Sequence, residues 1–324
     1  MQKWRKNRRK VKMNGQDVLC NECPRIECGD FDNYPVIYVD KKATGAGDGS
    51  SWTDAYTDIQ TAVNAHPKAE IQIKGYGEED CYPAGISLPE CAYLHGVDTG
   101  SGDAWIDGEN TSLRGVTGSD NTKVKSLNIK NCTGYGFDRI PYVENCTAKD
   151  ISPSATSISY CFYICTYLAN CQVVMTKINR AYGFYRYAEC ESCVVDAVNR
   201  GFYTIYGITK NCSAYNCYGE DGDFYYTGTG FFVYHGNEIE GCIAYNCIKG
   251  FVISKYTTTI YVTDCISHDN SSHGFYTIGL SSRILVYTNC VSYNNGGCGF
   301  TPSGSGTSYI DCSEYGNESE CGMQ

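Results

Sequence analysis

Short runs in which hydrophobic and polar residues alternate recur along this chain, separated by Asn, Asp and Gly. Alternation of this kind predicts β-strands with one face inward and one face outward. The pattern is clearest in four hexapeptides with a cysteine at the second position: Asn211–Asn216, Gly241–Asn246, Asp264–Asp269 and Asn289–Asn294. The steps between these cysteines are 30, 23 and 25 residues. A period in the twenties with small residues and Asn at fixed places predicts a repeat fold.

Each hexapeptide is followed by a phenylalanine. Three reach a Gly-Phe pair, which ends in Phe251, Phe275 and Phe300, and the first reaches Asp223-Phe224. No repeat contains an amphipathic run long enough to form a helix of ten residues, so the repeats are predicted to stack as coils of strands rather than as helical pairs.

From about residue 36 to its end, the chain resembles the right-handed parallel β-helix proteins of the pectate-lyase-like superfamily. The resemblance is carried by the Asn-Cys-x-Ala-x-Asn and Gly-Phe motifs of these repeats. It implies an all-β fold, a single-stranded right-handed parallel β-helix (solenoid). It does not imply one activity, since this fold carries lyases, hydrolases, adhesins and viral spikes alike.

The chain is predicted to have three parts: a basic, cysteine-containing arm over 1–36, an N-terminal cap with the first coils over 37–120, and repeats with a C-terminal cap over 121–324. A helix is expected over Asp54–Ala65, where Ile59, Ala62 and Val63 share one face. Together with the preceding Gly-rich loop, which ends in Ser-Trp, this helix resembles the cap of the family. The expected strands of the first coils are Ile37–Asp40, Glu70–Lys74, Tyr93–Val97 and Trp105–Gly108.

The cysteines of the repeats are expected to act as small buried apolar groups and to form one internal column with one member per coil. The predicted members are Cys132, Cys146, Cys171, Cys193, Cys212, Cys242, Cys265, Cys290 and Cys312. The first step, from Cys132 to Cys146, is only 14 residues. A turn or a register break is therefore expected near Pro141. The repeat asparagines that precede a cysteine in Asn-x-Ser/Thr triplets, Asn131, Asn145 and Asn211, are interpreted as turn or ladder positions rather than as glycosylation sites.

The formal net charge of −10 is unevenly distributed. Residues 1–15 hold seven bases and no acid, so the rest carries 19 bases against 36 acids, a net charge of −17. A basic arm on an acidic body predicts docking on an anionic partner or on other proteins of one assembly. The alternative is a solvated tail. The arm residues are Lys3, Arg5, Lys6, Arg8, Arg9, Lys10 and Lys12.

The chain has 21 cysteines, an odd number, so at least one thiol has no partner within the chain. Residues 1–16 are basic and polar and lack a signal-peptide core, which predicts synthesis without the usual export signal. Cys20, Cys23 and Cys28 have the spacing of a partial zinc site, but no fourth ligand follows, so local packing or a disulfide is preferred. No metal is predicted with confidence.

Catalytic motifs of the family's polygalacturonases (Asn-Thr-Asp, Asp-Asp and Gly-His-Gly) are absent from the sequence. The best acidic cluster is Glu220, Asp221 and Asp223, in a turn of the longest repeat. These carboxylates could serve as acid and base or hold calcium, the one cofactor considered. The alternative is a solvated turn.

Aromatic residues follow the Gly-Phe positions at Tyr185, Tyr203, Tyr225, Phe232 and Tyr276. If the Phe points inward, these residues point outward and form a ladder that could contact glycans or a neighbouring subunit. Stacking that only stabilises the solenoid is the alternative. His268 takes the place that tyrosines hold in the other repeats and is interpreted as a repeat substitution.

These features favour a non-catalytic structural or adhesion protein, and within this class a virion surface component such as a phage fibre, spike or decoration protein. Its expected partners are structural proteins of the same assembly, bound through the arm, and surface glycans, with a homo-oligomer considered. Its expected location is the virion surface or the extracellular space, with no membrane span. The alternatives are a polysaccharide lyase or glycoside hydrolase (a depolymerase), and a bacterial extracellular surface β-helix protein.

Overall fold

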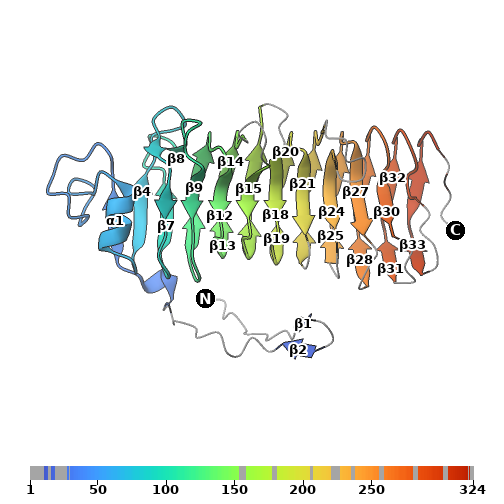
Figure 1. Ribbon diagram of the computed structural model, residues 1–324, viewed down its shortest axis with the longest axis horizontal. Coiled ribbons are helices and arrows are strands. Elements are labelled where there is room, and N and C mark those ends of the chain that lie inside the picture. Colours follow the sequence, from blue (N-terminus) through green and yellow to red (C-terminus); the bar gives the residue numbers. More distant parts are fainter. Residues whose placement is uncertain are drawn as a thin grey trace.

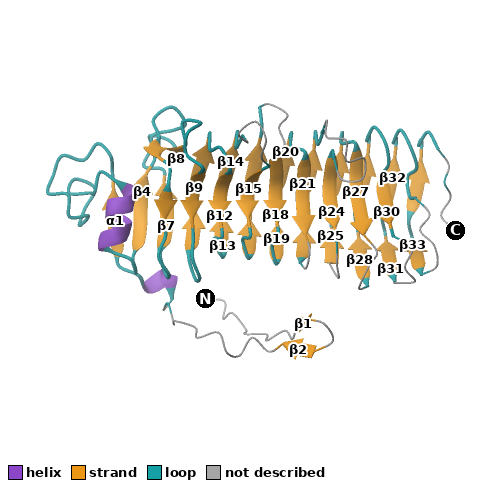
Figure 2. Cartoon of the chain, viewed as in Figure 1, coloured by secondary structure: helices purple, strands orange, loops and turns teal. Residues whose placement is uncertain are grey.

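In the computed structural model the chain forms an elongated stack of short strands that run across its long axis (Figures 1 and 2). The structure describes residues 11–13, 16–18, 28, 30–152, 158–176, 181–204, 207–219, 227–234, 238–254, 259–279, 284–301, 306–319 and 321. Helix is confined there to α1 (Ile59–Ala65) and the 3-10 turn η1 (Phe31–Asn33). None of the described helices has the length and hydrophobicity needed to span a bilayer.

Each coil between the two ends of the stack contributes one strand to each of three parallel sheets, which we call I, II and III in the order in which the chain visits them. Sheet I contains β3 (Val36–Val39), β4 (Glu70–Lys74), β7 (Tyr93–Val97), β10 (Lys123–Lys125), β13 (Tyr142–Glu144), β16 (Tyr167–Ala169), β19 (Glu189–Glu191), β22 (Ile208–Lys210), β25 (Glu238–Glu240), β28 (Ile260–Thr263), β31 (Leu285–Thr288) and β33 (Thr307–Ile310).

Sheet II contains β5 (Tyr82–Pro83), β8 (Ala104–Asp107), β11 (Leu127–Lys130), β14 (Thr147–Lys149), β17 (Gln172–Val174), β20 (Val194–Asp196), β23 (Ser213–Tyr215), β26 (Ile243–Tyr245), β29 (Ile266–His268), β32 (Val291–Tyr293) and β34 (Ser313–Tyr315). Sheet III contains β6 (Ile86–Ser87), β9 (Arg114–Thr117), β12 (Tyr135–Asp138), β15 (Ser159–Tyr163), β18 (Ala181–Tyr185), β21 (Arg200–Thr204), β24 (Thr229–Val233), β27 (Lys249–Ser254) and β30 (Phe275–Ile278). In the arm, β1 (Val11–Met13) and β2 (Gln16–Val18) form an antiparallel pair.

The corners of the coil depend on residues that tolerate a left-handed backbone. Asn145 and Asn211 follow strands of sheet I with φ of 53° and 52°, and Asn216 and Asn246 follow strands of sheet II with φ of 54° and 51°. Asn adopts this conformation more readily than other side chains with a Cβ. The interpretation of the repeat asparagines as turn residues is therefore confirmed.

A cysteine follows the left-handed residue at the corner after sheet I and points into the core. Its Sγ lies 3.1–3.4 Å from the carbonyl oxygen two residues earlier, so the thiol can donate a weak hydrogen bond that an alanine could not. The members of this column are Cys146, Cys171, Cys193, Cys212, Cys242, Cys265, Cys290 and, half-buried in the last coil, Cys312. The predicted internal column is confirmed for these eight.

Cys132 is the exception, because it lies at the corner after sheet II, as Cys217 and Cys247 do. The short step from Cys132 to Cys146 therefore covers two of the three sides of a coil, since it contains β12 of sheet III and β13 of sheet I. Of the two possibilities predicted near Pro141, the register break is wrong, since β13 pairs in parallel with β10 before it and β16 after it. The turn is confirmed, because the corner between β12 and β13 lies there, with Arg139 at a φ of 55°.

The phenylalanines of the repeats form a continuous stack inside sheet III. Neighbouring ring centroids lie 4.7–4.9 Å apart with planes within 13° of parallel. The rings belong to Phe137, Phe162, Phe184, Phe202, Phe231, Phe251, Phe275 and Phe300, each at most 1% exposed. In the longest coil the repeat position is Phe231, which pairs with Phe202 and Phe251, and not Phe224, which lies outside the described residues.

The helix α1 begins five residues later than predicted. The side chain of Asp58 caps its first turn by accepting from the Thr61 backbone N–H at 2.7 Å. Asp54 instead accepts from the backbone N–H of Ala46 and from Ser51, which fixes the preceding loop. The helix packs on β3 and β4 at the N-terminal end of the stack (Figure 1). Its function as a cap stays a prediction.

Candidate functional site

The predicted aromatic ladder lies on the outer side of sheet III, but it is less exposed than expected. Tyr185, Tyr203, Phe232 and Tyr276 occupy equivalent positions, with Val252 between the last two. Phe232 is only 1% exposed and packs with Val252 and Ile278 in a small outer cluster, so its predicted role as an outward contact is wrong. Tyr225 lies outside the described residues.

The rings of this ladder stack on one another. The centroids of Tyr163 and Tyr185, of Tyr185 and Tyr203, and of Tyr203 and Phe232 are 5.5, 4.9 and 4.9 Å apart, with planes within 25°. A ring sandwiched in this way offers its edge and hydroxyl to solvent, whereas a sugar packs on a ring face. The geometry therefore favours contact with another protein over stacking on sugar.

A second column of tyrosines, which the sequence interpretation missed, stands beside the first. Tyr135, Tyr160 and Tyr182 stack at 5.5 and 5.3 Å, and Tyr160 also contacts Tyr163 and Tyr185 of the first column. The signal was available in the sequence, because a Tyr two residues before the buried Phe recurs in three successive repeats.

Arginines frame these two columns. The guanidinium carbons of Arg114, Arg186 and Arg200 lie 5.4, 5.3 and 4.8 Å from tyrosine ring centroids. Burial raises the pKa of Tyr160 and of Tyr203 to about 12, so both hydroxyls stay neutral at physiological pH. We call this surface the tyrosine–arginine face: Tyr135, Tyr160, Tyr163, Tyr182, Tyr185, Tyr203, Arg114, Arg139, Arg186 and Arg200.

Sheet II carries its own outer stack in the C-terminal half. Tyr215, Tyr245, His268, Tyr293 and Tyr315 follow one another at 4.7–5.2 Å with planes within 13°. The interpretation of His268 as a repeat substitution is therefore confirmed. Beside this stack lies an open hollow of about 480 Å³, lined by Tyr218, Asn246, Cys247, Asp269, Asn270, Ser271, Asn294, Gly296 and Glu318.

A second hollow, of about 520 Å³, lies on the outer face of sheet II in the N-terminal half, and we call it the Trp105 groove. Trp105 on β8 pairs in register with Asn128 on β11, and no other aromatic ring of the described residues stacks on it. The face of the Trp105 indole ring is therefore not covered by another aromatic ring of the described residues. The lining consists of Glu78, Asp103, Trp105, Ser126, Asn128, Asn145, Thr147, Lys149, Gln172 and Val174.

Polar groups of the Trp105 groove are held in place by neighbouring coils. Asn128 is 6% exposed and accepts from the Thr147 backbone N–H at 2.9 Å, which fixes the orientation of its amide. Glu78, from the loop after β4, forms an ion pair with Lys149 at 2.5 Å. Lys130 donates to the Glu78 carbonyl oxygen at 2.6 Å and so ties this loop to sheet II.

The Trp105 groove therefore combines one ring with hydroxyl, amide and charged groups, which is the composition of a site for a polar ring-shaped ligand. The sequence interpretation missed it because its residues come from successive coils and form no local motif. Considered alone, each of them is an ordinary strand, corner or loop residue.

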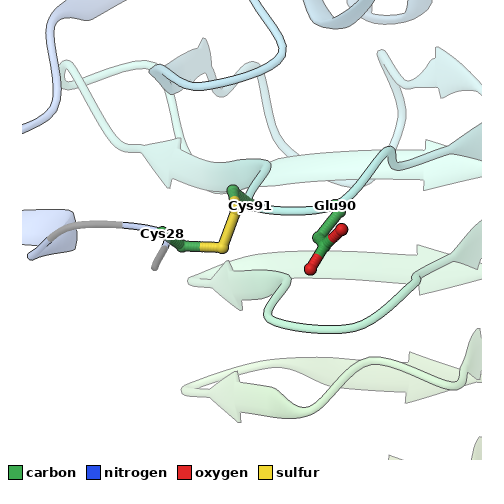
Figure 3. Close-up of side chains that lie close together, drawn as sticks. All are labelled: Cys28, Glu90 and Cys91. Carbon is green, nitrogen blue, oxygen red and sulfur yellow. A yellow bond between two sulfur atoms is a disulfide. The ribbon is translucent and has the colours of Figure 1, made fainter. Parts of the chain in front are cut away.

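The other predicted sites receive no support from the structure. Glu220, Asp221 and Asp223 lie outside the described residues, as do Cys20 and Cys23. Cys28 is bonded to Cys91 in a disulfide (Figure 3), so it offers no thiolate for a metal and its assignment as a candidate ligand is wrong. The preference for a disulfide there is confirmed.

Glu90 lies beside this disulfide (Figure 3), and the three residues are the one group in the described chain with the proximity of metal ligands. A second disulfide joins Cys298 to Cys321 in the last coils. Fifteen described cysteines keep free thiols, and thirteen of them are buried.

Comparison with known proteins decides the fold. The model of the family described as "Right handed beta helix region" matches residues 179–314. The fold is the right-handed parallel β-helix. The β-helix repeat protein expected from the sequence is thus confirmed, although the match covers less than half of the chain. No curated protein sequence matches the chain.

Solved structures similar to this β-helix include the A-module of the mannuronan C-5 epimerase AlgE4 from Azotobacter vinelandii, at 17% identity and a TM-score of 0.48, over 85% of this chain and 76% of that one. A rhamnogalacturonan lyase is 13% identical with a TM-score of 0.37, over 81% of this chain and 69% of the lyase. Tailspike protein 3 of bacteriophage CBA120 is 13% identical with a TM-score of 0.34, over 89% of this chain and 60% of the tailspike. These scores carry no argument about function.

Proposed function

We propose that this β-helix is a non-catalytic adhesion protein that binds a glycan in the Trp105 groove. The observation that carries the proposal is Trp105 itself, an aromatic ring on a sheet face that no other described ring stacks on. Sugar rings pack their apolar faces on such rings, while amides and charged groups bind their hydroxyls. Asn128, Asn145 and Gln172 supply the amides of this groove, and Lys149 supplies a charge.

Replacing Trp105 by alanine should weaken glycan binding by about 5- to 150-fold, since one aromatic ring that buries its face contributes about 1–3 kcal/mol. Binding is measured by calorimetry or on immobilised neutral and uronate polysaccharides. The matched control is Tyr203→Ala on sheet III, which should leave binding unchanged. Equal losses in the two variants, or binding by Trp105→Ala at the wild-type level, would contradict the proposal.

Incubation with the same polysaccharides distinguishes a glycan-binding protein from an enzyme that cleaves the glycan. A polysaccharide lyase or hydrolase would release unsaturated or reducing ends during incubation, with or without calcium. The groove contains the carboxylates of Glu78 and Asp103, which would then be tested as Glu78→Gln and Asp103→Asn. We expect binding without release of chain ends.

We propose further that the protein is a surface component of a virion and is attached through its N-terminal arm. Two observations support this placement. Seven bases within residues 1–15 contrast with an acidic body. The disulfides Cys28–Cys91 and Cys298–Cys321 are suited to an oxidising exterior. A bacterial cell-surface location is the alternative.

Deletion of residues 1–27 should leave the β-helix folded, because every strand of sheets I to III lies beyond this segment and Cys28 keeps its bond to Cys91. The truncated chain should show the same melting temperature within a few degrees but lose incorporation into its parent assembly, measured by co-sedimentation with particles. Normal incorporation would exclude the arm as the attachment device.

A further inference from the structure

Positive charge is concentrated on one face of this acidic solenoid. Arg114 and Arg200 lie on strands of sheet III, and Arg139 and Arg186 lie at the corners that follow β12 and β18. The strands of sheet III contain one carboxylate, Asp138, which is buried and lies 3.3 Å from the Nε atoms of both Arg114 and Arg139. The tyrosine–arginine face is therefore cationic and aromatic.

Sheet I has the opposite character. Between β13 and β28 its strands carry five glutamates and one lysine, a net charge of −4. Glu189 and Glu238 are exposed, and Tyr142 and Tyr261 on the same face are 43% and 52% exposed. The glutamates are Glu144, Glu189, Glu191, Glu238 and Glu240, and the last pairs with Lys210 at 2.8 Å. We call this surface the glutamate face.

The two faces repeat with the same spacing, because the strands of sheets I and III belong to the same coils. Neighbouring strands in a sheet are about 4.8 Å apart, so charges on either face recur at multiples of that distance. The glutamates lie on alternate strands of sheet I (β13, β19 and β25), and Arg139 and Arg186 are likewise two coils apart. Two copies placed side by side with parallel axes can therefore bring two arginines of one copy to glutamates of the other at the same time.

We infer that the tyrosine–arginine face of one chain docks on the glutamate face of a second copy of this chain. Tyrosine and arginine are the residues that contribute most at the centres of protein interfaces. The stacked tyrosines form a firm patch with few side-chain rotations left to lose, and the arginines at its rim match the charge of the partner. The two contacting faces differ, so the association is heterologous and builds a ring or a chain of copies.

Sedimentation velocity of the full chain over a range of concentrations tests this association. The wild type should self-associate, and raised salt should weaken it. A first variant, Arg186→Glu with Arg200→Glu, and a second, Glu189→Lys with Glu238→Lys, should each raise the dissociation constant at least tenfold. An equimolar mixture of the two variants should associate again, because each reversed face then meets a complementary one.

Thermal melts of both variants verify that they remain folded, and the regained association of the mixture separates lost contact from lost structure. A monomeric wild type at all concentrations would overturn the inference. Self-association that neither variant weakens would also overturn it. The inference would equally be overturned if the protein is monomeric and its tyrosine–arginine face binds heparin, used as an anionic polysaccharide probe. In that case the variant with Arg186→Glu and Arg200→Glu would no longer bind heparin. None of these results depends on the Trp105 groove.

Discussion

Replacing Phe231 by alanine should destabilise the β-helix by about 3–5 kcal/mol, as for large-to-small changes at other fully buried rings. Phe231 is 1% exposed and its ring lies 4.7 Å from those of both Phe202 and Phe251. The hydrogen-bonded ladders that join β24 to β21 and β27 fix the spacing of the coils, so the neighbouring rings cannot close the cavity. Denaturant unfolding followed by circular dichroism measures the loss.

The matched variant for this position is Phe231→Leu, which fills more of the space and should cost clearly less than the alanine variant. Losses below about 1 kcal/mol for both variants would mean that the phenylalanine stack contributes little to stability, since even partial loss of a buried ring exceeds that value. The stack would then be a by-product of the repeat rather than a source of cohesion.

Replacing Cys242 by aspartate should cost several kcal/mol, because a charged group would be buried without a partner. Cys242 is fully buried, and burial raises the pKa of its thiol well above the ordinary value, so it stays neutral. Cys242→Ala loses the sulfur and its weak contacts with the carbonyl oxygens of Glu240 and Thr209, and it should cost much less. Chemical denaturation of both variants provides the comparison.

Cys81, which is half-buried and outside the internal column, provides a control position. Cys81→Asp should be tolerated better than Cys242→Asp, since its side chain can reach water. Equally small losses for aspartate and alanine at Cys242 would show that this column faces solvent and would contradict the fold described above.

The fold could be predicted because its rules are local and repeated. Alternation identifies each strand, and a left-handed Asn followed by a buried cysteine marks a corner wherever it occurs, as at Asn211 and Cys212. The repetition of this motif also explains why Cys132 was assigned to the wrong corner. Two of the three corners use the same pair of residues, so the motif cannot tell which corner it marks.

Other features could not be predicted, because they depend on neighbouring coils. The repeat position of Phe231 is set by its partners Phe202 and Phe251, and the intervening insertion obscures it in the sequence. Phe232 alternates like an outward residue, yet the cluster with Val252 buries it. In the Trp105 groove, Trp105 and Asn128 are 23 residues apart in sequence and meet only when coils stack.

Because neighbouring coils pair in the same register, the axial length of the β-helix can change by whole coils. From Cys171 to Cys193 the chain completes one circuit in 22 residues and returns to an equivalent position, with the same corner, cysteine and phenylalanine contacts. Duplication or excision of such a unit changes the axial length by about 4.8 Å and leaves matching surfaces at the junction. Evolution can therefore change the distance between the two ends of the β-helix by one coil at a time, while the residues at each end stay the same.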